Sequence, residues 1–361
     1  MCYNFKKIIG VTNMDITDID VNLKVETEIQ KEGIKFLNCT TPPFKIYGVF
    51  RENGRFRRIP EKVAESVSDG VLFLHTDTAG GRIRFKTNSP YVAIICDNGK
   101  RIRRMSHFAF TGSAGLDLYA DNVFVKTFIP HISTENKFES IIEMGEKKER
   151  DITINLPLYS GVAELYIGLD SDSYVKEPTP YKNDKPIVYY GSSITQGGCA
   201  SRPGMSYESI ISRRFNCDFI NLGFSGNAKG EVEITDYIKN LEMSLFVYDY
   251  DHNAPDADHL RDTHEKMFLA IREKHPTLPI VMATSPKFAP NDQFQLRRDI
   301  IHTTYKNALA RGDRNVYFIS GQDLMQYCEN DGTVDGTHPT DFGFYSMAKA
   351  FGDLFEKESL I

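Results

Sequence analysis

The pattern of apolar and polar residues changes about half-way along the chain. Before residue 180, short apolar runs alternate with turn residues, and they cover 71–75, 82–85, 91–96, 116–119, 123–125, 152–156 and 165–169. Short strands at regular spacing with turns between them are typical of an antiparallel β-sandwich. The sequence therefore predicts an antiparallel β-sandwich for the first half. A hairpin or a bulge is expected between 71–75 and 82–85, and a hairpin is expected between 116–119 and 123–125.

Residues 176–186 separate this half from the next. The stretch is polar and holds Pro178, Pro180 and Pro186. Because proline cannot donate to a sheet ladder and disfavours helix, we interpret the stretch as a linker. It predicts an N-terminal domain over 1–180 and a second domain over 181–361.

After the linker, strand-like and helical patterns alternate. The predicted strands are 187–191, 218–224, 244–251, 280–284 and 316–321. The predicted helices are 207–215, 232–241, 260–274, 296–310 and 342–355. Strands alternating with helices indicate a parallel sheet covered by helices on both faces, which is an α/β fold.

Composition narrows the function classes. The 361 residues are 41% hydrophobic and 25% charged, with a formal net charge of −6, which is typical of a globular protein. The negative balance argues against a nucleic-acid partner, whose phosphates require clustered Lys and Arg. The two basic runs, 55–58 and 100–104, are short, and we interpret them as solvated loop ends.

The six cysteines show no Cys-x-x-Cys spacing, so neither a disulfide framework nor a zinc site is expected, and no cofactor is implied. No apolar run is long enough to span a membrane. Residues 8–11 are too short a run for the core of a signal peptide, so an intracellular protein is expected, although a secreted chain trimmed of its leader would look the same. The sequence leaves a homo-oligomer open.

The first candidate for chemistry is the stretch 186–198, where a β-branched and aromatic run ends at Gly191 and is followed by Ser192 and Ser193. Ligands of open α/β sheets collect beyond the carboxyl ends of the strands, so these serines lie where chemistry is expected. The alternative is that the serines only cap the next helix.

A second candidate pair follows the last strand. Asp335 and His338 are three residues apart in a turn shaped by glycine and proline. This spacing can bring the carboxylate against the imidazole Nδ1 and leave the other nitrogen free to accept a proton from a serine. The alternative is a carboxylate that caps the turn beside a surface histidine.

Nucleophilic acyl transfer also needs donors for an oxyanion. Residues 221–227 end the second strand with small residues, and residues 248–255 end the third strand and contain Asn253. Asn253 could equally serve only to form its loop. All of these stretches fall at predicted carboxyl ends of strands, where one cleft would form.

Taken together, these blocks make the second half resemble the SGNH (GDSL-type) hydrolases, a family of esterases, lipases and acylhydrolases with a flavodoxin-like three-layer α/β/α fold. Four blocks match in order, at 191–195, 223–227, 251–253 and 335–338. The resemblance covers about residues 186–355.

The resemblance implies a role for each block. It makes Ser193 the nucleophile, His338 the base and Asp335 its partner, and it forms the oxyanion hole from Ser193, Gly226 and Asn253. Two positions depart from the family pattern. Ser192 stands where the first block usually has Asp, and the third block lacks the usual Gly-x-Asn-Asp form.

The order of the two predicted domains is similar to that of certain bacterial carbohydrate esterases, in which a jelly-roll-like module precedes the SGNH domain, and this likeness implies a jelly-roll-like sandwich for the first half. This likeness favours an acetylated sugar as substrate, with Arg202 of the loop 197–204 as a candidate substrate contact. Arg202 could equally be a solvated loop residue. Cys199 lies close to Ser193 in sequence, but no base is placed for it, so we interpret it as part of the loop packing.

The leading hypothesis is a serine esterase that removes small acyl groups, acetyl above all, from a small-molecule or carbohydrate ester. A lipase, phospholipase or thioesterase of the same fold is the second hypothesis. A carbohydrate-binding protein with an inactive hydrolase domain is the third.

Overall fold

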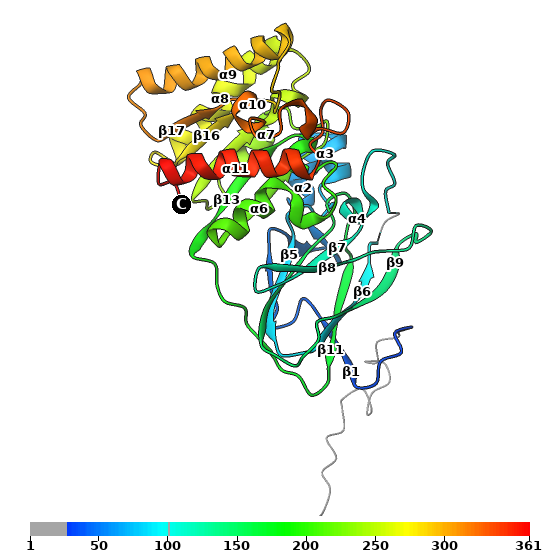
Figure 1. The fold of residues 1–361 in the computed structure, drawn as a ribbon. Coiled ribbons are helices and arrows are strands. Elements are labelled where there is room, and N and C mark those ends of the chain that lie inside the picture. The colour runs from blue at the N-terminus through cyan, green and yellow to red at the C-terminus, as the bar shows by residue number, and fades with distance from the viewer. Residues whose placement is uncertain (1–26, 100–101) are drawn as a thin grey trace, which may run out of the picture.

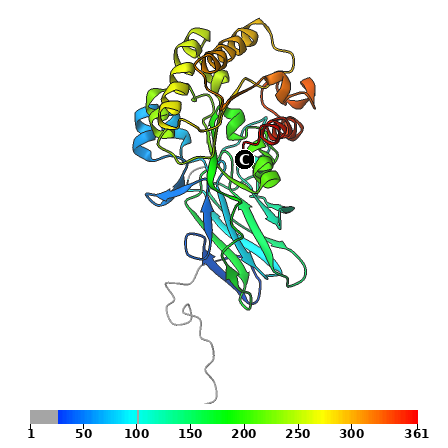
Figure 2. The same cartoon turned by 90° about the vertical axis from the view of Figure 1, so that its left-hand side faces the viewer.

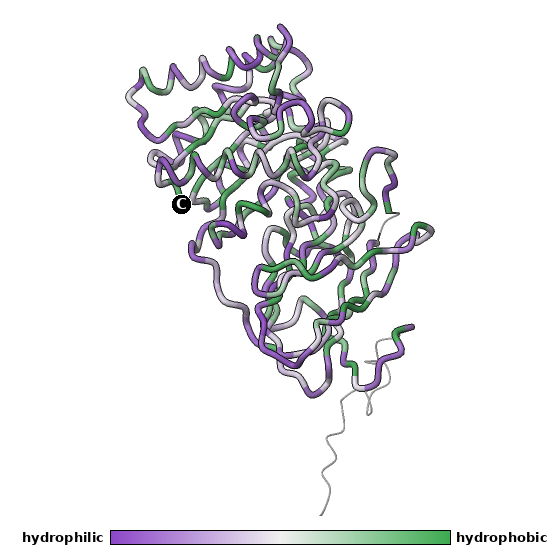
Figure 3. The backbone as a smooth tube through the Cα atoms, in the orientation of Figure 1, coloured by the Kyte–Doolittle hydropathy of each residue, from purple (hydrophilic) through white to green (hydrophobic). Residues whose placement is uncertain are grey.

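The computed structural model describes residues 27–99 and 102–361, which form a β-sandwich and an α/β domain stacked end to end (Figure 1). The N-terminal stretch 8–11 and the first two residues of the run 100–104 lie outside the described residues. Hydrophobic stretches run through the interior of both parts, while the outer helices carry much hydrophilic sequence (Figure 3).

The sandwich consists of two antiparallel sheets. One has the order β1 (Ile34–Asn38), β11 (Glu164–Asp170), β6 (Tyr91–Asp97), β9 (Lys137–Glu143). The other has the order β12 (Val175–Lys176), β5 (Arg82–Thr87), β10 (Arg150–Asn155), β7 (Leu116–Ala120), β8 (Val123–Phe128), with β2 (Lys45–Tyr47) also paired to β5. A separate pair joins β3 (Phe50–Glu52) to β4 (Arg55–Arg57), and a short helix, α4 (Phe110–Ser113), precedes β7.

The predicted hairpin between β7 and β8 is confirmed. Ala120 pairs with Val123, and the two turn residues Asp121 and Asn122 have φ values of 51° and 63°. Positive φ at both central residues is what a tight hairpin turn of type I′ requires, and Asp and Asn tolerate it better than most residues.

The other expected hairpin or bulge is wrong. Residues 71–75 do not form a strand, because α2 (Glu61–Val67) and α3 (Asp69–Leu74) occupy this region, with the Ser68 side chain capping α3. Ala64, Val71 and Leu74 are buried at helical spacing. A short apolar run of this kind is compatible with a strand or with a buried helix, and only the packing partner decides between them.

That partner is the α/β domain. Val71 and Leu74 share a hydrophobic core with Val188 and Leu222 of the parallel sheet and with Ile234. The two helices lie against the flank of the α/β domain, away from the sandwich sheets (Figure 2). A segment of the N-terminal half therefore completes the core of the C-terminal half.

The α/β domain contains a five-stranded parallel sheet. Its order is β14 (Cys217–Gly223), β13 (Asn183–Gly191), β15 (Leu245–Asp249), β16 (Ile280–Ala283), β17 (Val316–Ile319). This is the flavodoxin-like order 2-1-3-4-5, as expected. The first strand begins earlier than predicted, because Asn183 already pairs with Cys217, and β12 takes the first residue of the supposed linker into the sandwich.

Helices cover both faces of this sheet, which confirms the α/β prediction. One face carries α6 (Tyr207–Phe215) and α11 (Asp341–Lys357). The other carries α7 (Val232–Ile238), α8 (Ala257–Lys274) and α9 (Asp292–Ala310). Along β13, Ile187 and Tyr189 enter one core and Val188 and Tyr190 the other, so the strand is buried on both faces.

Five of the cysteines lie within the described residues, and all five are free thiols. None of the helices in the described part of the chain is both long and apolar enough to cross a bilayer.

The run 55–58 is not the solvated loop end expected from the sequence, because Arg55–Arg57 forms β4 and both Arg57 and Arg58 are buried. The buried guanidinium of Arg58 joins the two halves. Arg58 Nε donates to the Asp77 carbonyl at 2.9 Å, its Nη2 donates to the Leu74 carbonyl at 2.9 Å, and its Nη1 donates to the carbonyl of Gly223 at the end of β14. The guanidinium also lies 4.6 Å from the centre of the Phe224 ring. Burial lowers the pKa of Arg58 to about 10, so the group is still charged at neutral pH.

Leu74→Ala should therefore destabilise the α/β domain, although Leu74 belongs to the N-terminal half. Deleting a buried leucine side chain typically costs about 2–5 kcal/mol of unfolding free energy. Urea unfolding followed by circular dichroism measures this loss, with Glu65→Ala on the exposed face of α2 as the control. If two unfolding transitions are resolved and Leu74→Ala leaves that of the α/β domain unchanged, the shared core is refuted.

Candidate active site

The candidate site begins where β13 ends. Gly191 is followed by Ser192, whose Oγ accepts a hydrogen bond from the Ile194 N–H at 3.1 Å and so caps the short helix α5 (Ser193–Gln196). Gly197 ends this helix in the left-handed region, with φ of 95°. The two residues that flank the helix therefore hold Ser193 at its first position, at the carboxyl edge of the sheet. The capping role considered for the serines belongs to Ser192.

The ends of three neighbouring strands lie side by side at this edge. Gly191 is in register with Gly223 of β14 and with Asp249 of β15. A Cβ on Gly191 would lie 1.8 Å from Oδ1 of Asp249, so only glycine allows this close approach. The loops after the three strands consequently start from one point.

Ser193 lies near the beginning of the α/β domain's sequence and His338 near its end, but the fold brings the two side chains together. Ser193 Oγ lies 3.0 Å from His338 Nε2, within hydrogen-bond distance. His338 lies in the loop between η4 (Glu329–Gly332) and α11, where Val334 donates its N–H to the His338 carbonyl at 2.9 Å. This loop returns the histidine to the carboxyl edge of the sheet.

Asp335 holds the other nitrogen of the ring. His338 Nδ1 lies 2.8 Å from Asp335 Oδ2, and Asp335 Oδ1 accepts hydrogen bonds from the N–H groups of Thr337 at 3.0 Å and His338 at 2.8 Å. Partial burial acts to raise the pKa of the Asp335 carboxyl, but these hydrogen bonds outweigh it and hold the pKa well below its usual range. The carboxylate is therefore ionised, and it both orients the imidazole and stabilises its charged form. The turn-capping role considered for Asp335 is also real, since the same carboxylate accepts the two backbone N–H groups.

The two predicted oxyanion residues lie in the loops that follow β14 and β15, the strands on either side of β13. Gly226 follows β14, has φ of 70° and is exposed. Asn253 ends the short helix η3 (Tyr250–Asn253) after β15, and its Oδ1 accepts the Ala228 N–H at 3.3 Å. With its oxygen turned to Ala228, this side chain presents its Nδ2 hydrogens as donors.

The unusual third block has a defined conformation. The Asp251 carboxylate accepts the N–H of Ser285 at 3.0 Å and its hydroxyl at 2.7 Å, and His252 Nδ1 lies 2.9 Å from the same hydroxyl. Burial, with Lys287 and other cations nearby, lowers the pKa of His252 to about 4, so this imidazole is neutral at ordinary pH. Ser285 therefore anchors the loop that carries Asn253.

The sandwich contributes residues that the sequence did not single out. The Tyr159 hydroxyl donates to the Ser193 carbonyl at 3.1 Å. The rings of His107 and Phe108 lie with their centres 5.5 and 5.9 Å from that of His338. No local pattern marks these three residues, because only the packing of the sandwich on the α/β domain brings them to the site.

A polar chain connects the sandwich to the loop of Gly226. Gln196 Oε1 accepts the Ser225 N–H at 3.0 Å, and its Nε2 donates to Asp77 Oδ2 at 3.1 Å. Arg103 forms an ion pair with the same carboxylate at 2.8 Å. Gln196, at the end of α5, thereby fixes the start of the loop of Gly226 relative to Ser193.

Arg202 is held by protein groups. Its Nη1 lies 2.9 Å from Oδ2 of the fully buried Asp117, it donates to the Tyr119 hydroxyl, and it stacks on the ring of Phe124 at 3.8 Å. The structure thus gives Arg202 a place between the two parts of the molecule. Its contact with a substrate stays a prediction.

Cys199 lies with His107 and His338 in a group whose potential ligand atoms are within 4.8 Å of one another. Such a group could hold a metal ion. However, burial raises the pKa of the Cys199 thiol to about 12, and thiolate rather than thiol is the metal ligand. Metal binding would also compete with Ser193 for Nε2 of His338.

Comparison with known proteins follows the same division of the chain. Residues 184–356 match the model of the GDSL-like Lipase/Acylhydrolase family. Residues 34–175 match the family described as the N-terminus of Esterase_SGNH_hydro-type, whose short name, GxDLY, is spelled by residues 115–119 of this chain.

Residues 184–356 therefore form a domain of the GDSL-like lipase/acylhydrolase family. The protein is an ester-hydrolysing enzyme, and its residues 34–175 form the N-terminal domain described for esterases of the SGNH hydrolase type. The resemblance stated from the four sequence blocks is thereby confirmed.

Solved structures agree with this assignment. A Bacteroides ovatus ATCC 8483 protein described as a GDSL-like lipase is 29% identical with a TM-score of 0.79, over 90% of this chain and 97% of that one. The salicylyl-acyltransferase SsfX3 of a tetracycline biosynthetic pathway is 19% identical with a TM-score of 0.74, over 92% and 99% of the two chains. An acetyl xylan esterase of Butyrivibrio proteoclasticus is 11% identical with a TM-score of 0.58, over 90% and 98%. No curated protein matches the chain by sequence.

A second carboxyl at the same edge is in the opposite state from Asp335. Asp249 is buried beneath Gly191, and its Oδ1 accepts a hydrogen bond from the Thr195 hydroxyl at 2.6 Å. Burial raises the pKa of the Asp249 carboxyl to about 8, against the opposing hydrogen bond from Thr195. Asp249 is therefore largely protonated at neutral pH, while Asp335 is ionised.

This contrast predicts a pH-dependent stability. Asp249 keeps its proton up to about pH 8 in the folded enzyme but only up to about pH 4 in the unfolded chain, so the folded state holds the extra proton between these values. The free energy of unfolding should fall as pH rises through this window, by at most about 1.4 kcal/mol per pH unit. Asp249→Asn removes this slope. Urea unfolding between about pH 5 and about pH 8 should show the variant gaining on the wild type as pH rises.

The exposed Asp262→Asn on α8 is the matched control, and its stability curve should run parallel to that of the wild type. Parallel curves for Asp249→Asn and the wild type would show that Asp249 is ionised in the folded enzyme.

Proposed function

We propose that the enzyme hydrolyses esters of small acyl groups, acetyl above all, on a carbohydrate, through a triad of Ser193, His338 and Asp335. The observation that carries this proposal is the continuous chain of contacts from Ser193 Oγ to His338 Nε2, at 3.0 Å, and from His338 Nδ1 to Asp335 Oδ2, at 2.8 Å. A hydroxyl, a base and an orienting carboxylate in this order are what nucleophilic acyl transfer requires.

In the first step, Ser193 Oγ attacks the ester carbonyl carbon while His338 Nε2 accepts its proton. A bond forms between Oγ and the carbon, and the carbonyl oxygen becomes an oxyanion. The ester C–O bond then breaks, and His338 returns the proton to the departing sugar oxygen. In the second step, water attacks the acyl-enzyme and gives its proton to His338, which passes it to Oγ as the acid leaves. Asp335 stays ionised throughout.

The oxyanion would be held by three donors. Ser193 is the first residue of α5, so its N–H has no partner within that helix. The Gly226 N–H and Asn253 Nδ2 come from the loops after the two neighbouring strands. Donors fixed in this way before the reaction stabilise developing charge without reorganisation, and losing one typically costs about 10²–10³-fold in rate.

Two features support a small acyl group and a sugar. The rings of His107 and Phe108 beside His338 leave less room for a long acyl chain than an open cleft would. The fold likeness to the acetyl xylan esterase extends over both parts of the chain, including the sandwich that supplies these rings. A lipase would instead need an apolar channel leading away from Ser193.

Removing the nucleophile, or the charge of the carboxylate that orients its base, should abolish turnover without unfolding the enzyme. Ser193→Ala and Asp335→Asn should each lower kcat on p-nitrophenyl acetate by about 10³-fold or more, because the nucleophile is lost or the imidazole loses its orienting charge. Ser192→Ala is the matched control, since this neighbouring hydroxyl only caps α5, and it should still be labelled by a fluorophosphonate probe. Wild-type turnover by folded Ser193→Ala would refute the triad.

The substrate class needs a separate measurement. Hydrolysis of acetylated mono- and oligosaccharides should exceed that of long-chain fatty-acyl esters, and rates on aryl esters should fall as the acyl chain lengthens beyond a few carbons. Phe108→Ala should relax that preference, because it removes one ring beside His338. Activity that instead rises with chain length in the wild type would favour the lipase hypothesis.

A further inference from the structure

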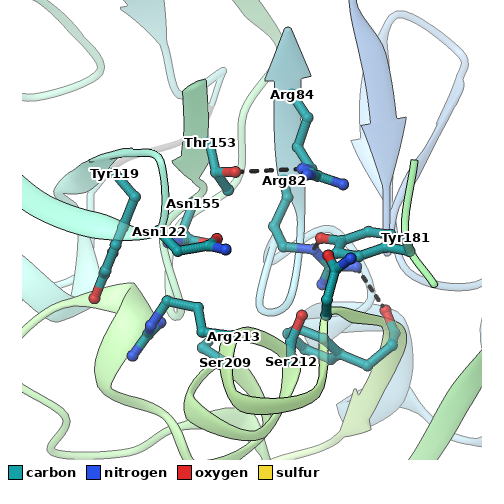
Figure 4. Close-up of a pocket in the computed structure, with 12 residues that line it drawn as sticks. Arg82, Arg84, Tyr119, Asn122, Thr153, Asn155, Tyr181, Ser209, Ser212 and Arg213 are labelled. Carbon is teal, nitrogen blue, oxygen red and sulfur yellow. Dashed lines mark hydrogen bonds between the residues drawn. The ribbon is translucent and has the colours of Figure 1, made fainter. Parts of the chain in front are cut away.

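A polar cavity lies in the seam between the sandwich and the α/β domain, away from Ser193 (Figure 4). The space that the centre of a water molecule can occupy in it is about 20 Å³. Its walls come from β5 and β10 on one side and from α6 and the beginning of β14 on the other. Because β14 begins at this cavity and ends at Gly223 beside the catalytic loops, the two sites lie at opposite ends of one strand.

Positive charge dominates the cavity. Among the side chains that the structure describes, the twelve that line it include Arg82, Arg84 and Arg213 and no aspartate or glutamate. Figure 4 shows Arg82 and Arg84 on the side of the sandwich and Arg213 on the helix facing them. Two carboxylates form ion pairs with arginines of this region: Asp218 pairs with Arg82, and Asp117 pairs with Arg202. Among the described side chains, four arginines thus face two carboxylates, which leaves two positive charges in excess.

Arg84 is the residue with unused hydrogen-bonding capacity. Its side chain is only 5% exposed, its Nε donates to the Thr153 hydroxyl at 3.3 Å, and its guanidinium stacks on the ring of Tyr181 at 4.1 Å. Its Nη1 is buried, and none of the described residues accepts a hydrogen bond from it. A buried donor on a charged group without an acceptor is costly, so this atom calls for a ligand.

Arg213 contributes the second charge. Its guanidinium lies 4.4 Å from the centre of the Tyr119 ring. Burial lowers the pKa of Arg213, and the positive charge of Arg202 acts in the same direction. An anion in the cavity would relieve both effects, since it would supply the missing countercharge.

We propose that this cavity binds a tetrahedral oxyanion, phosphate or sulfate, between Arg84 and Arg213. The planar guanidinium fork matches the oxygen atoms of such anions, and stacking on aromatic rings fixes its orientation beforehand. The space suits a small ion rather than a whole sugar ring with substituents, because only about 20 Å³ of it admits the centre of a water molecule. Since one arginine comes from each half, the anion would also hold the two halves together.

The proposal is independent of the reaction at Ser193. A ligand bound at the start of β14 does not touch Ser193, His338 or the loops that carry the oxyanion donors. Bound phosphate is therefore expected to raise the melting temperature and to leave KM for an acetyl ester unchanged. Competitive inhibition would instead place the anion in the catalytic cleft.

Isothermal titration calorimetry of the full chain with inorganic phosphate and with sulfate tests the proposal, at constant ionic strength set by chloride. We expect a dissociation constant of about 1 mM or tighter, and a melting temperature that rises with either anion beyond its value in chloride. Arg84→Met and Arg213→Met should each weaken binding by about tenfold or more, since each removes charge-assisted hydrogen bonds. Arg314→Gln changes an exposed arginine in the loop between α9 and β17; it is the matched control and should bind as the wild type does.

A sugar phosphate and a sugar sulfate in the same titration identify the source of the anion. Binding of the inorganic ions alone assigns the site to free phosphate or sulfate, and tighter binding of the sugar esters assigns it to a charged group carried by a carbohydrate. The proposal fails if neither inorganic anion binds or stabilises the wild type more than chloride does. It also fails if folded Arg84→Met and Arg213→Met both bind phosphate with wild-type affinity.

Discussion

The buried guanidinium of Arg58 is the contact on which the rest of the structure depends. It comes from the N-terminal half, yet it donates to the Gly223 carbonyl where β14 ends and the loop of Gly226 begins. A charged group taken out of water must have every donor satisfied, and carbonyls of Leu74, Asp77 and Gly223 supply that need from both halves. The segment around residue 75 and the end of β14 are consequently fixed relative to each other, and this contact also fixes where the loop of Gly226 begins.

The sandwich is part of the candidate active site rather than an appended module. It supplies Tyr159 beneath Ser193, and it supplies Asp77, which through Gln196 holds the N–H of Ser225. The matched families follow the same division, with one for each half. A hydrolase domain cut away at the linker would lose its core partners on α2 and α3 together with these polar supports.

Environment gives the carboxyl groups at the catalytic edge different states. Asp335 accepts two backbone N–H groups and the imidazole of His338, which favour its charged form. Asp249 is fully buried with one hydroxyl donor, which leaves its neutral form favoured. One carboxyl can thus orient a base while the other serves as neutral packing beneath Gly191, although both follow strands or turns of the same sheet edge.

The sequence by itself determined the elements of the α/β domain and the residues at its strand ends. Neighbouring residues encode a buried strand, a tight turn and two serines, and the resemblance to the SGNH hydrolases selected Ser193 from the two. Tertiary structure alone decided that residues 71–75 are helical, since their apolar run fits either element until the α/β core covers one face. It also decided the contacts of Asp77 and Arg84, whose partners lie far away in the chain. Short-range patterns record what a segment can form, whereas burial and charge pairing across the seam depend on which distant segments meet there.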